Sequence, residues 1–483
     1  MTQWEVVIGL EIHAQVTTQS KLFCSCSTQF GSTPNTQVCP VCTGMPGALP
    51  VLNRTVLDKA ITLGLATHCT INEHNEFARK NYFYPDLPKG YQISQLDKPI
   101  CSLGYLDVEV DGSTRRIGLT RIHMEEDAGK LVHQGSDNIK GATHSLVDLN
   151  RSSVPLVEIV SEPDIRSAKE AKAYMESMAQ IVRWLGVCDG NLEEGSLRCD
   201  ANISLRPKGT ETLGTKTEVK NLNSFKSVER AILLEIERQT DILDEGGTII
   251  QETRHYNEAT NSTKSLRSKE EAHDYRYFPD PDLVPIAIDR AWVSRIEQTL
   301  PELPTARHKR YQTELGLSDY DAGKMTVDRE TGDFFEATLS LGSSAKEIAN
   351  WLNGDISAWL KEHSSTLAIC KLTPAHLAEM LKELINGTIS GKIAKQLVDD
   401  MLETGTHPST LIKEKGLAQV NDTGAINQMI DIVLSENPKA VEDLKAGKVQ
   451  TMGFIVGQVM RKSQGKANPD QVNKRLKELF SLS

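Results

Sequence analysis

The 483-residue sequence has no long uninterrupted apolar run. A helix that crosses a bilayer needs about 20 predominantly apolar residues, so no membrane span is expected. The first residues, Met1 to Glu5, also lack the basic start and apolar stretch of a secretory signal peptide. The sequence therefore predicts a cytoplasmic protein that is not inserted in a membrane.

An excess of positive charge is also missing, because 65 acidic residues outnumber 54 basic ones and give a net charge of −11. A general nucleic-acid-binding protein would be basic overall. The segment Gly209 to Thr217 only approaches a phosphate-binding loop, since one extra residue precedes Lys216, and we expect a surface hairpin there. No glycine-rich dinucleotide fingerprint follows a predicted strand. A nucleotide would need another architecture, such as an open sheet face with carboxylates and metal ions.

The nine cysteines do not fit a disulfide framework, because their number is odd and the chain is expected to be cytosolic. Four of them form two short pairs, Cys24-Ser-Cys26 and Cys39-Pro-Val-Cys42. Four thiolates suit a closed tetrahedral structural zinc site. The alternative is a set of reduced cysteines without a metal.

Changes in residue composition and periodicity along the chain predict three domains. Residues 1–293 combine β-branched runs with Gly/Pro turns and helical segments, which favours an α+β catalytic domain with a mixed sheet. A proline-rich passage from Pro279 to Pro304 follows. Residues 294–405 and 406–483 then show helical periodicity, which predicts an all-α domain and a small helical tail.

Several elements are specific enough to be checked. A buried strand is expected from Val6, an alternating strand over residues 196–206, and a helix over residues 168–185. Two helices are expected to begin at Thr373 and Ser390 and to end at Gly387 and Gly405. The remaining apolar stripes are Ile348, Trp351, Leu352, Ile356, Trp359 and Leu360 in one helix, and Val472, Leu476, Leu479 and Phe480 in the last.

Glu11 and His13 are the first candidate site residues. If the strand from Val6 continues, they share one face while Leu10 and Ile12 point into the core. A carboxylate beside an imidazole can bind a metal or transfer protons. The alternative is a solvent-facing pair at a strand end.

The run Glu125-Glu126-Asp127 is the second candidate. Three consecutive acids repel one another unless a cation lies near, and Mg²⁺ prefers carboxylate oxygens. The alternative, a solvated turn, fits most acidic runs. However, an apolar, strand-like lead-in precedes this run, which favours a metal–phosphate site. Asp127 can equally be a structural acid that closes the turn.

Positive charge for phosphate groups is available within the polar clusters at Lys80, Lys89, Arg151, Arg198 and Lys220. The segment Arg79 to Gln92, with its aromatic, proline and glycine residues, predicts either a shaped binding loop or an aromatic-packed connection. The tail is locally basic, which favours polyanion binding over a merely solvated helical face. Its cations are Lys445, Lys448, Arg461, Lys462, Lys466, Lys474, Arg475 and Lys477.

These segments together resemble the B subunits of tRNA-dependent amidotransferases over essentially the whole chain, and the tail resembles the YqeY-like helical module. The strings that carry the resemblance are Gly9-Leu-Glu-Ile-His13, Arg79-Lys-Asn-Tyr-Phe-Tyr-Pro-Asp86, Tyr91-Gln-Ile-Ser-Gln95, His123-Met-Glu-Glu-Asp-Ala-Gly-Lys130, Glu158-Ile-Val-Ser-Glu-Pro-Asp164, Glu194-Gly-Ser-Leu-Arg-Cys-Asp-Ala-Asn202, Glu218-Val-Lys-Asn-Leu-Asn-Ser224 and Gly453-Phe-Ile-Val-Gly-Gln-Val-Met460.

The resemblance implies a glutamine-synthetase-like catalytic fold and a heterotrimer with an amidase (glutaminase) subunit and a small clamp subunit. It implies that the chain uses ATP and Mg²⁺ to phosphorylate the side-chain carboxylate of Asp or Glu mischarged on tRNA(Asn) or tRNA(Gln). Ammonia from the amidase then displaces phosphate.

Carried over residue by residue, the resemblance implies Mg²⁺ ligands at Glu11, His13 and Glu125. It also implies further site residues, which fall into three groups. These are Glu126 and Glu218 as additional catalytic residues, Lys80, Tyr82, Lys89, Arg198 and Lys220 along the ammonia route or at the substrate, and Lys448, Arg461, Lys462, Lys466 and Lys474 for tRNA.

Two other functions fit the same residues. A metal-dependent hydrolase would cleave tRNA or its ester without ATP. A non-catalytic tRNA-binding scaffold would be indifferent to the acids of the first domain. The sequence leaves open whether Asp-tRNA, Glu-tRNA or both are substrates.

Overall fold

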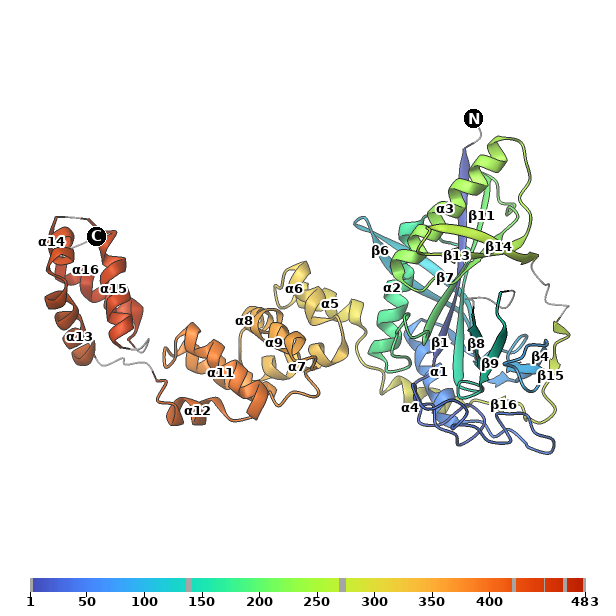
Figure 1. The fold of residues 1–483 in the computed structure, drawn as a ribbon, viewed down its shortest axis with the longest axis horizontal. Helices are drawn as coiled ribbons and strands as arrows, with labels where there is room; N and C mark the ends of the chain where they lie inside the picture. Colours follow the sequence, from blue (N-terminus) through green and yellow to red (C-terminus); the bar gives the residue numbers. More distant parts are fainter. Residues whose placement is uncertain are drawn as a thin grey trace. The chain divides into compact units, whose positions relative to one another are not determined.

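The computed structural model describes residues 3–135, 141–268, 275–418, 423–446, 448–463 and 467–480. The chain forms two compact units, Met1–Leu303 and Pro304–Ser483 (Figure 1). Within the described ranges, no helix has the length and apolar character that crossing a membrane requires.

A nine-stranded sheet forms the centre of the first unit. Its order is β14-β13-β12-β11-β1-β10-β7-β6-β2, and every neighbouring pair is antiparallel except β12 and β13. The sheet is therefore mixed, and the predicted α+β class is confirmed. The strands are β1 (Trp4–Gln15), β2 (Thr70–Ile71), β6 (Cys101–Val110), β7 (Ser113–Glu126), β10 (Pro155–Ser161), β11 (Leu197–Pro207), β12 (Thr217–Lys220), β13 (Glu252–Asn257) and β14 (Ser262–Ser268).

Among the described residues, three small sheets accompany the large one. Their orders are β15-β4-β5, β16-β3 and β8-β9. The strands are β3 (His74–Asn75), β4 (Ala78–Asn81), β5 (Tyr91–Ser94), β8 (Lys130–Gln134), β9 (His144–Asp148), β15 (Phe278–Pro279) and β16 (Ile286–Ala287). The β4–β5 hairpin carries the aromatic segment, and β15 pairs with β4.

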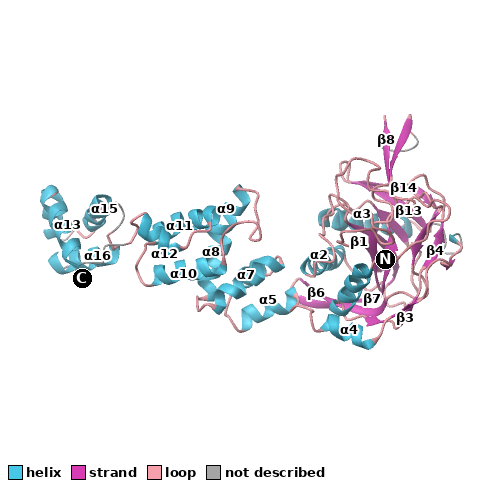
Figure 2. Ribbon diagram, turned by 90° about the horizontal axis from the view of Figure 1, so that it is seen from below, coloured by secondary structure: helices cyan, strands magenta, loops and turns pink. Residues whose placement is uncertain are grey.

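Helices cover one face of the large sheet, as Figure 2 shows for α2 and α3. The helices of this unit are α1 (Arg54–Ala66), α2 (Ala168–Trp184), α3 (Phe225–Asp244) and α4 (Arg290–Glu297). Leu10 and Ile12 of β1 lie in the core between sheet and helices, both at most 1% exposed. The opposite face of the sheet is left for polar side chains.

The sequence predicted the main elements of this unit correctly. β1 includes Val6, α2 matches the helix expected over residues 168–185, and β11 alternates as expected, with Cys199, Ala201 and Ile203 buried. The residues between β11 and β12 connect two antiparallel strands, so the predicted hairpin near Gly209 is also confirmed.

The named elements of the second unit, within its described residues, are all helices joined by loops. Its helices are α5 (Pro304–Thr313), α6 (Asp319–Met325), α7 (Arg329–Ser340), α8 (Ala345–Trp351), a π-helical turn (Leu352–Ile356), α9 (Ser357–Glu362), α10 (Pro374–Ile385), α11 (Gly391–Thr404), α12 (Pro408–Glu414), α13 (Thr423–Glu436), α14 (Pro438–Lys445), α15 (Thr451–Lys462) and α16 (Pro469–Phe480).

Capping residues set the predicted helix ends here. The Thr373 hydroxyl accepts from the N–H of His376, and Gly405 ends α11 with a positive φ of 73°. The stripe from Ile348 is not one helix, because the backbone leaves helical geometry at Gly354. Leu479 was predicted to face inward, but it is 42% exposed, so that prediction is wrong. The short α16 buries Val472 and Leu476, and the predicted inward residue Phe480 packs partly buried against the same core, whereas Leu479 lies at the surface.

In the described part of this unit, two separate apolar cores are present. One extends from Tyr311 through Leu411 and Ile412 of α12, and the other lies between Ile426 and Leu476. The tail therefore has its own core, while the predicted domain limits at 293 and 405 stay predictions.

Candidate functional site

Strand register brings four polar side chains together on the face of the sheet opposite α2 and α3. His13 on β1 stands opposite Glu158 on β10, and Glu158 stands opposite His123 on β7. Glu125 follows His123 by two residues, so it lies on the same face. Three neighbouring strands therefore build one cluster.

The distances within this cluster are short. His13 Nε2 lies 3.2 Å from Glu158 Oε2 and 3.6 Å from Glu125 Oε1. His123 Nε2 lies 3.5 Å from Glu158 Oε2 and 3.8 Å from Glu125 Oε2. One ligand atom from each of His13, Glu125 and Glu158 lies within 4.8 Å of the others. Two of these three donors are carboxylates, the donors that Mg²⁺ prefers, so the residues fit such an ion.

The cluster holds opposite charges in a buried place. Burial by itself would lower the pKa of His13, but the hydrogen bond and charge of Glu158 raise it to about 9. Burial would also lower the pKa of His123, but the charge of Glu158 raises it. Burial would raise the pKa of Glu158, but the charge of His123 holds it well below its ordinary value. The carboxylates are therefore ionised at neutral pH.

The acidic run is not a solvated turn. Glu125, Glu126 and Asp127 are 3%, 1% and 4% exposed. Each acid has a different environment, because neighbouring residues of a strand point to opposite faces. The solvated-turn alternative is thereby excluded.

Glu126 lies away from the histidines. It accepts hydrogen bonds from the Ile93 N–H at 2.9 Å and from the Ser153 hydroxyl, and it pairs with Lys89. The structure thus brings two predicted site residues, Glu126 and Lys89, into a buried ion pair. It does not bring Glu126 to His13.

Asp127 holds an arginine in place. Its Oδ2 accepts from Arg198 Nη2 at 2.8 Å and from Gln15 Nε2 at 3.0 Å, and it lies 3.6 Å from Arg151 Nε. Burial would raise the pKa of Asp127, but the charge of Arg198 keeps it below its ordinary value. This environment agrees with the structural role considered for Asp127.

Glu11 and Glu218 lie on the same face of the sheet as the cluster of His13, but they are not part of that cluster. Glu11 stands opposite Asp200 and accepts from Asn202 Nδ2 at 2.9 Å. Glu218 accepts from Thr253 Oγ1 at 2.8 Å and lies 3.5 Å from Lys220, which also pairs with Asp200. The tight group of ligand atoms contains Glu158 in the place that was predicted for Glu11.

A cavity of about 430 Å³ opens over the cluster. Its wall includes His13, Lys80, Tyr82, Glu125, Arg198 and Lys220, so it gathers most of the predicted channel and substrate residues. Lys80 Nζ lies 4.9 Å from the ring centre of Tyr275. Burial would lower the pKa of Lys80, but the charge of Glu125 raises it. Phe83 in the same hairpin is 95% exposed, which argues against a purely aromatic-packed connection.

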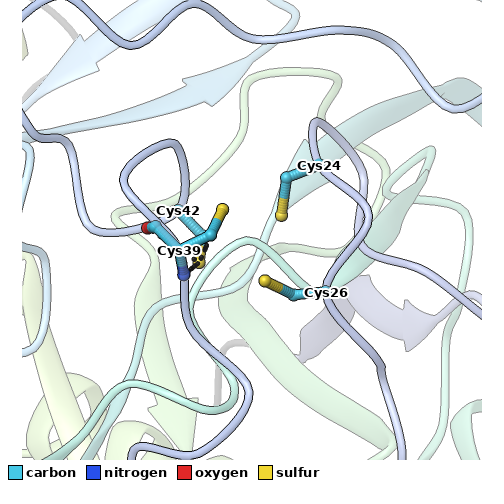
Figure 3. Close-up of side chains that lie close together, drawn as sticks. All are labelled: Cys24, Cys26, Cys39 and Cys42. Carbon is cyan, nitrogen blue, oxygen red and sulfur yellow. Dashed lines mark hydrogen bonds between the residues drawn. The ribbon is translucent and has the colours of Figure 1, made fainter.

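The four predicted zinc cysteines converge. Figure 3 shows the sulfur atoms of Cys24 and Cys26 facing those of Cys39 and Cys42, and all four lie within 4.8 Å of one another. A hydrogen bond with Cys24 lowers the pKa of Cys42 to about 4, and the ammonium of Lys21 contributes. The cluster can therefore bind a metal such as zinc, which takes four thiolates tetrahedrally. All nine cysteines are unpaired, as expected.

The basic residues of the tail are partly neutralised. Lys448 lies 2.8 Å from Asp443, and Lys462 pairs with Glu436. Arg461 and Lys474 are exposed. Lys466 lies outside the described residues.

Sequence reasoning missed two members of the cluster, His123 and Glu158. His123 could have been found by alternation, since it lies two residues before Glu125 on the same strand. Glu158 is a lone acid inside the apolar strand Pro155–Ser161, which is itself a signal of a functional carboxylate.

Comparison with known proteins agrees with this fold. Residues 6–294 match the GatB/GatE catalytic domain family, and residues 333–480 match the GatB domain family. The aspartyl/glutamyl-tRNA(Asn/Gln) amidotransferase B subunit of Geobacter sp. (strain M21) is 57% identical over 475 residues, which cover 98% of each chain. The proteins of the same name from Geobacter sulfurreducens and Carboxydothermus hydrogenoformans are 56% identical over 473 residues (98% of each chain) and 53% identical over 478 residues (99% of each chain). The resemblance noted in the sequence is thus confirmed, and the chain belongs to the family of aspartyl/glutamyl-tRNA(Asn/Gln) amidotransferase B subunits.

Proposed function

We propose that this chain activates the side-chain carboxylate of Glu-tRNA(Gln), Asp-tRNA(Asn) or both for amidation, using ATP and Mg²⁺. The name of its relatives supports the tRNA substrates and a complex of several subunits. In this complex an amidase subunit releases ammonia from glutamine and a small subunit clamps the assembly. The cytoplasmic location expected from the sequence belongs to the same proposal.

The observation that carries the proposal is the cluster of His13, His123, Glu125 and Glu158, two of whose members, His13 and Glu125, line a cavity together with Lys80, Arg198 and Lys220. A carboxylate is a poor electrophile until one of its oxygens becomes part of a leaving group. Phosphoryl transfer needs positioning and charge neutralisation more than a protein nucleophile. A polar sheet face with cations in the cavity wall meets that need.

The reaction has two steps. A carboxylate oxygen attacks the γ-phosphorus of ATP, the bond to the bridging oxygen breaks, and ADP leaves. Ammonia then attacks the acyl carbon of the acyl phosphate. The C–O bond to phosphate breaks, one ammonia proton passes to the phosphate, and the amide remains.

The side chains have distinct tasks in this reaction. His13, Glu125 and Glu158 would hold Mg²⁺, which when bound neutralises phosphate charge. Lys80 and Lys220 line the cavity and would face the phosphate groups. Arg198 is held by Asp127 and would orient an anionic group of the substrate, since a guanidinium offers several fixed donors.

Three further assignments belong to this proposal. Lys80, Tyr82 and the Lys89–Glu126 pair would line the route of ammonia, because they join the β4–β5 hairpin to the end of β7. The four cysteines would bind one structural Zn²⁺ and fix the loop between them. The exposed Arg461 and Lys474 of the tail would contact tRNA phosphates.

Reconstitution with the partner subunits, mischarged tRNA, glutamine and ATP tests the proposal. We expect amidated tRNA and one phosphate released for each amide. Cleavage of tRNA or of its ester without ATP, visible on acid gels, would show a hydrolase instead. Amide yield that is unaffected by Glu125→Ala would show a scaffold whose acids are not catalytic.

A further inference from the structure

A second cavity of about 700 Å³ lies beside the candidate site. Its wall combines the end of β1, residues 28–32 of the loop between Cys26 and Cys39, and the loop that precedes β11. Small-molecule sites usually measure about 300–1,000 Å³, so this cavity has the size of a ligand site. The mechanism proposed above gives it no task.

One hydrogen-bonded group of side chains has members in the walls of both cavities. Gln15 and Arg151 line the second cavity, whereas Asp127 and Arg198 line the first. Asp127 Oδ2 accepts from both Gln15 and Arg198, at 3.0 and 2.8 Å. A molecule held in the second cavity therefore lies next to the phosphoryl-transfer site.

An aromatic side chain, Phe30, lies in the wall of this cavity. Phe30 lines it and is nevertheless 71% exposed, although phenylalanine is usually buried. An exposed aromatic ring in a binding cavity offers a stacking surface for a base. Hydroxyl and amide side chains supply hydrogen bonds around it, namely those of Thr28, Gln29, Ser32, Gln37 and Asn150.

The charges around the cavity select against phosphate. The residues that line the cavity include two cations, Lys130 and Arg151, and four carboxylates, Asp148, Asp189, Glu193 and Glu194. Carboxylates repel phosphate groups, but they accept hydrogen bonds from ribose hydroxyls and from the amino group of a base. The lining thus fits the nucleoside part of a nucleotide and leaves the phosphates outside.

We propose that this second cavity binds an adenosine moiety, with its base on Phe30 and its ribose hydroxyls toward the loop of Glu193 and Glu194. The inference rests on the proposed function, because that reaction uses two substrates with an adenosine end. One is ATP, and the other is the 3′-terminal adenosine of the tRNA. Both present the same chemistry to the cavity.

Photolabelling of the reconstituted complex tests this assignment, with 2-azidoadenosine as the probe and mass spectrometry to locate the label. We expect labelled peptides to include residues 28–32. Two competitors distinguish the sources. Displacement by a non-hydrolysable ATP analogue identifies the adenosine of ATP, whereas displacement by tRNA, but not by tRNA without its terminal adenosine, identifies the tRNA end.

Two matched variants control for folding. Phe30→Ala should reduce labelling about tenfold, within the range expected for loss of one base–aromatic stacking contact. Ile250→Ala removes an apolar side chain that is equally exposed, at 74%, and that lines neither cavity. This second variant should label like the wild type.

Three results would overturn the assignment: label outside residues 28–32, label that neither competitor displaces, or label that Phe30→Ala leaves unchanged. Amide formation by the same complex is measured in parallel. A complex that amidates tRNA but fails the labelling test contradicts only this inference. A complex that forms no amide contradicts the proposed function itself.

Discussion

His13 Nε2 lies 3.2 Å from Glu158 Oε2, across two neighbouring antiparallel strands. The two residues stand directly opposite each other in the register, which is the closest approach that a sheet offers to side chains of different strands. Burial would lower the pKa of His13, but Glu158 raises it to about 9. The pair thus joins two distant segments of the chain into the centre of the candidate site.

Replacing Glu158 tests the centre that this pair defines. Glu158→Gln keeps the shape but removes one anionic donor, and metal-bound charge stabilisation is worth several kcal/mol in such reactions. We expect kcat/KM for amide formation to fall about a hundredfold or more. Steady-state kinetics of the reconstituted complex measure it. Glu109→Gln, at the exposed end of β6, is the control, and a loss of similar size there would reject the assignment.

The cysteine cluster predicts about one zinc per chain, because four thiolates complete a tetrahedral site. Elemental analysis of the purified protein checks the metal content. Cys42→Ser removes a buried ligand and should abolish zinc binding. Cys370→Ser, in the helical unit, should retain the metal. Zinc content that is unchanged in Cys42→Ser would show that the four cysteines are not its ligands.

The buried Lys89–Glu126 pair allows stability to be separated from function, since the two side chains are only 8% and 1% exposed. Lys89→Met alone leaves a buried carboxylate uncompensated and should cost roughly 3–5 kcal/mol of unfolding free energy. Adding Glu126→Gln should restore most of it. Urea unfolding measures both variants.

The same double variant tests the ammonia route. It should lose amidation driven by glutamine but keep amidation driven by added ammonium salt. Equal activity with both nitrogen sources would place the route elsewhere.

Asp321 predicts a pH dependence in the helical unit. Its carboxylate is 8% exposed and accepts from Lys346 Nζ at 2.5 Å, a hydrogen bond that lowers the pKa of Asp321 below its ordinary value of 3.8. A lowered pKa means that the stabilisation is fully present above the unfolded value and is lost as the pH falls through the folded one. Asp321→Asn should therefore cost about 1.5 kcal/mol at pH 7 and much less below pH ~3.

Urea titrations at pH 7 and at low pH, followed by hydrogen exchange in α6, check this expectation. Asp319→Asn is a matched control on the same helix, because the Asp319 carboxylate is 85% exposed. A difference between wild type and Asp321→Asn that does not change with pH would show that the carboxylate charge is not the cause.

Local patterns in the sequence were enough to predict much of the fold. Alternation in β1 correctly separated Leu10 and Ile12 from Glu11 and His13, because side chains of a strand alternate between its faces. The caps at Thr373 and Gly405 were predicted from residue chemistry alone. The exposure of Leu479 was not predicted, because a stripe of apolar residues does not show how far the neighbouring helices extend.

The composition of the candidate site depended on long-range pairing, which local patterns do not contain. Alternation placed Glu11 on the correct face, but only the register of β1 with β10 shows that Glu158 stands opposite His13 and joins it in the group of ligand atoms. Three consecutive acids looked like one group in the sequence. In the structure Glu125 joins the histidines, Glu126 pairs with Lys89, and Asp127 holds Arg198.

Oxygen transfer tests the central claim most directly. tRNA carrying glutamate with both side-chain oxygens replaced by ¹⁸O is converted by the reconstituted complex with ATP and glutamine, and the released phosphate is analysed by mass spectrometry. If the carboxylate is activated as an acyl phosphate, each phosphate carries one ¹⁸O for each amide formed. Amide formation with unlabelled phosphate would contradict the account.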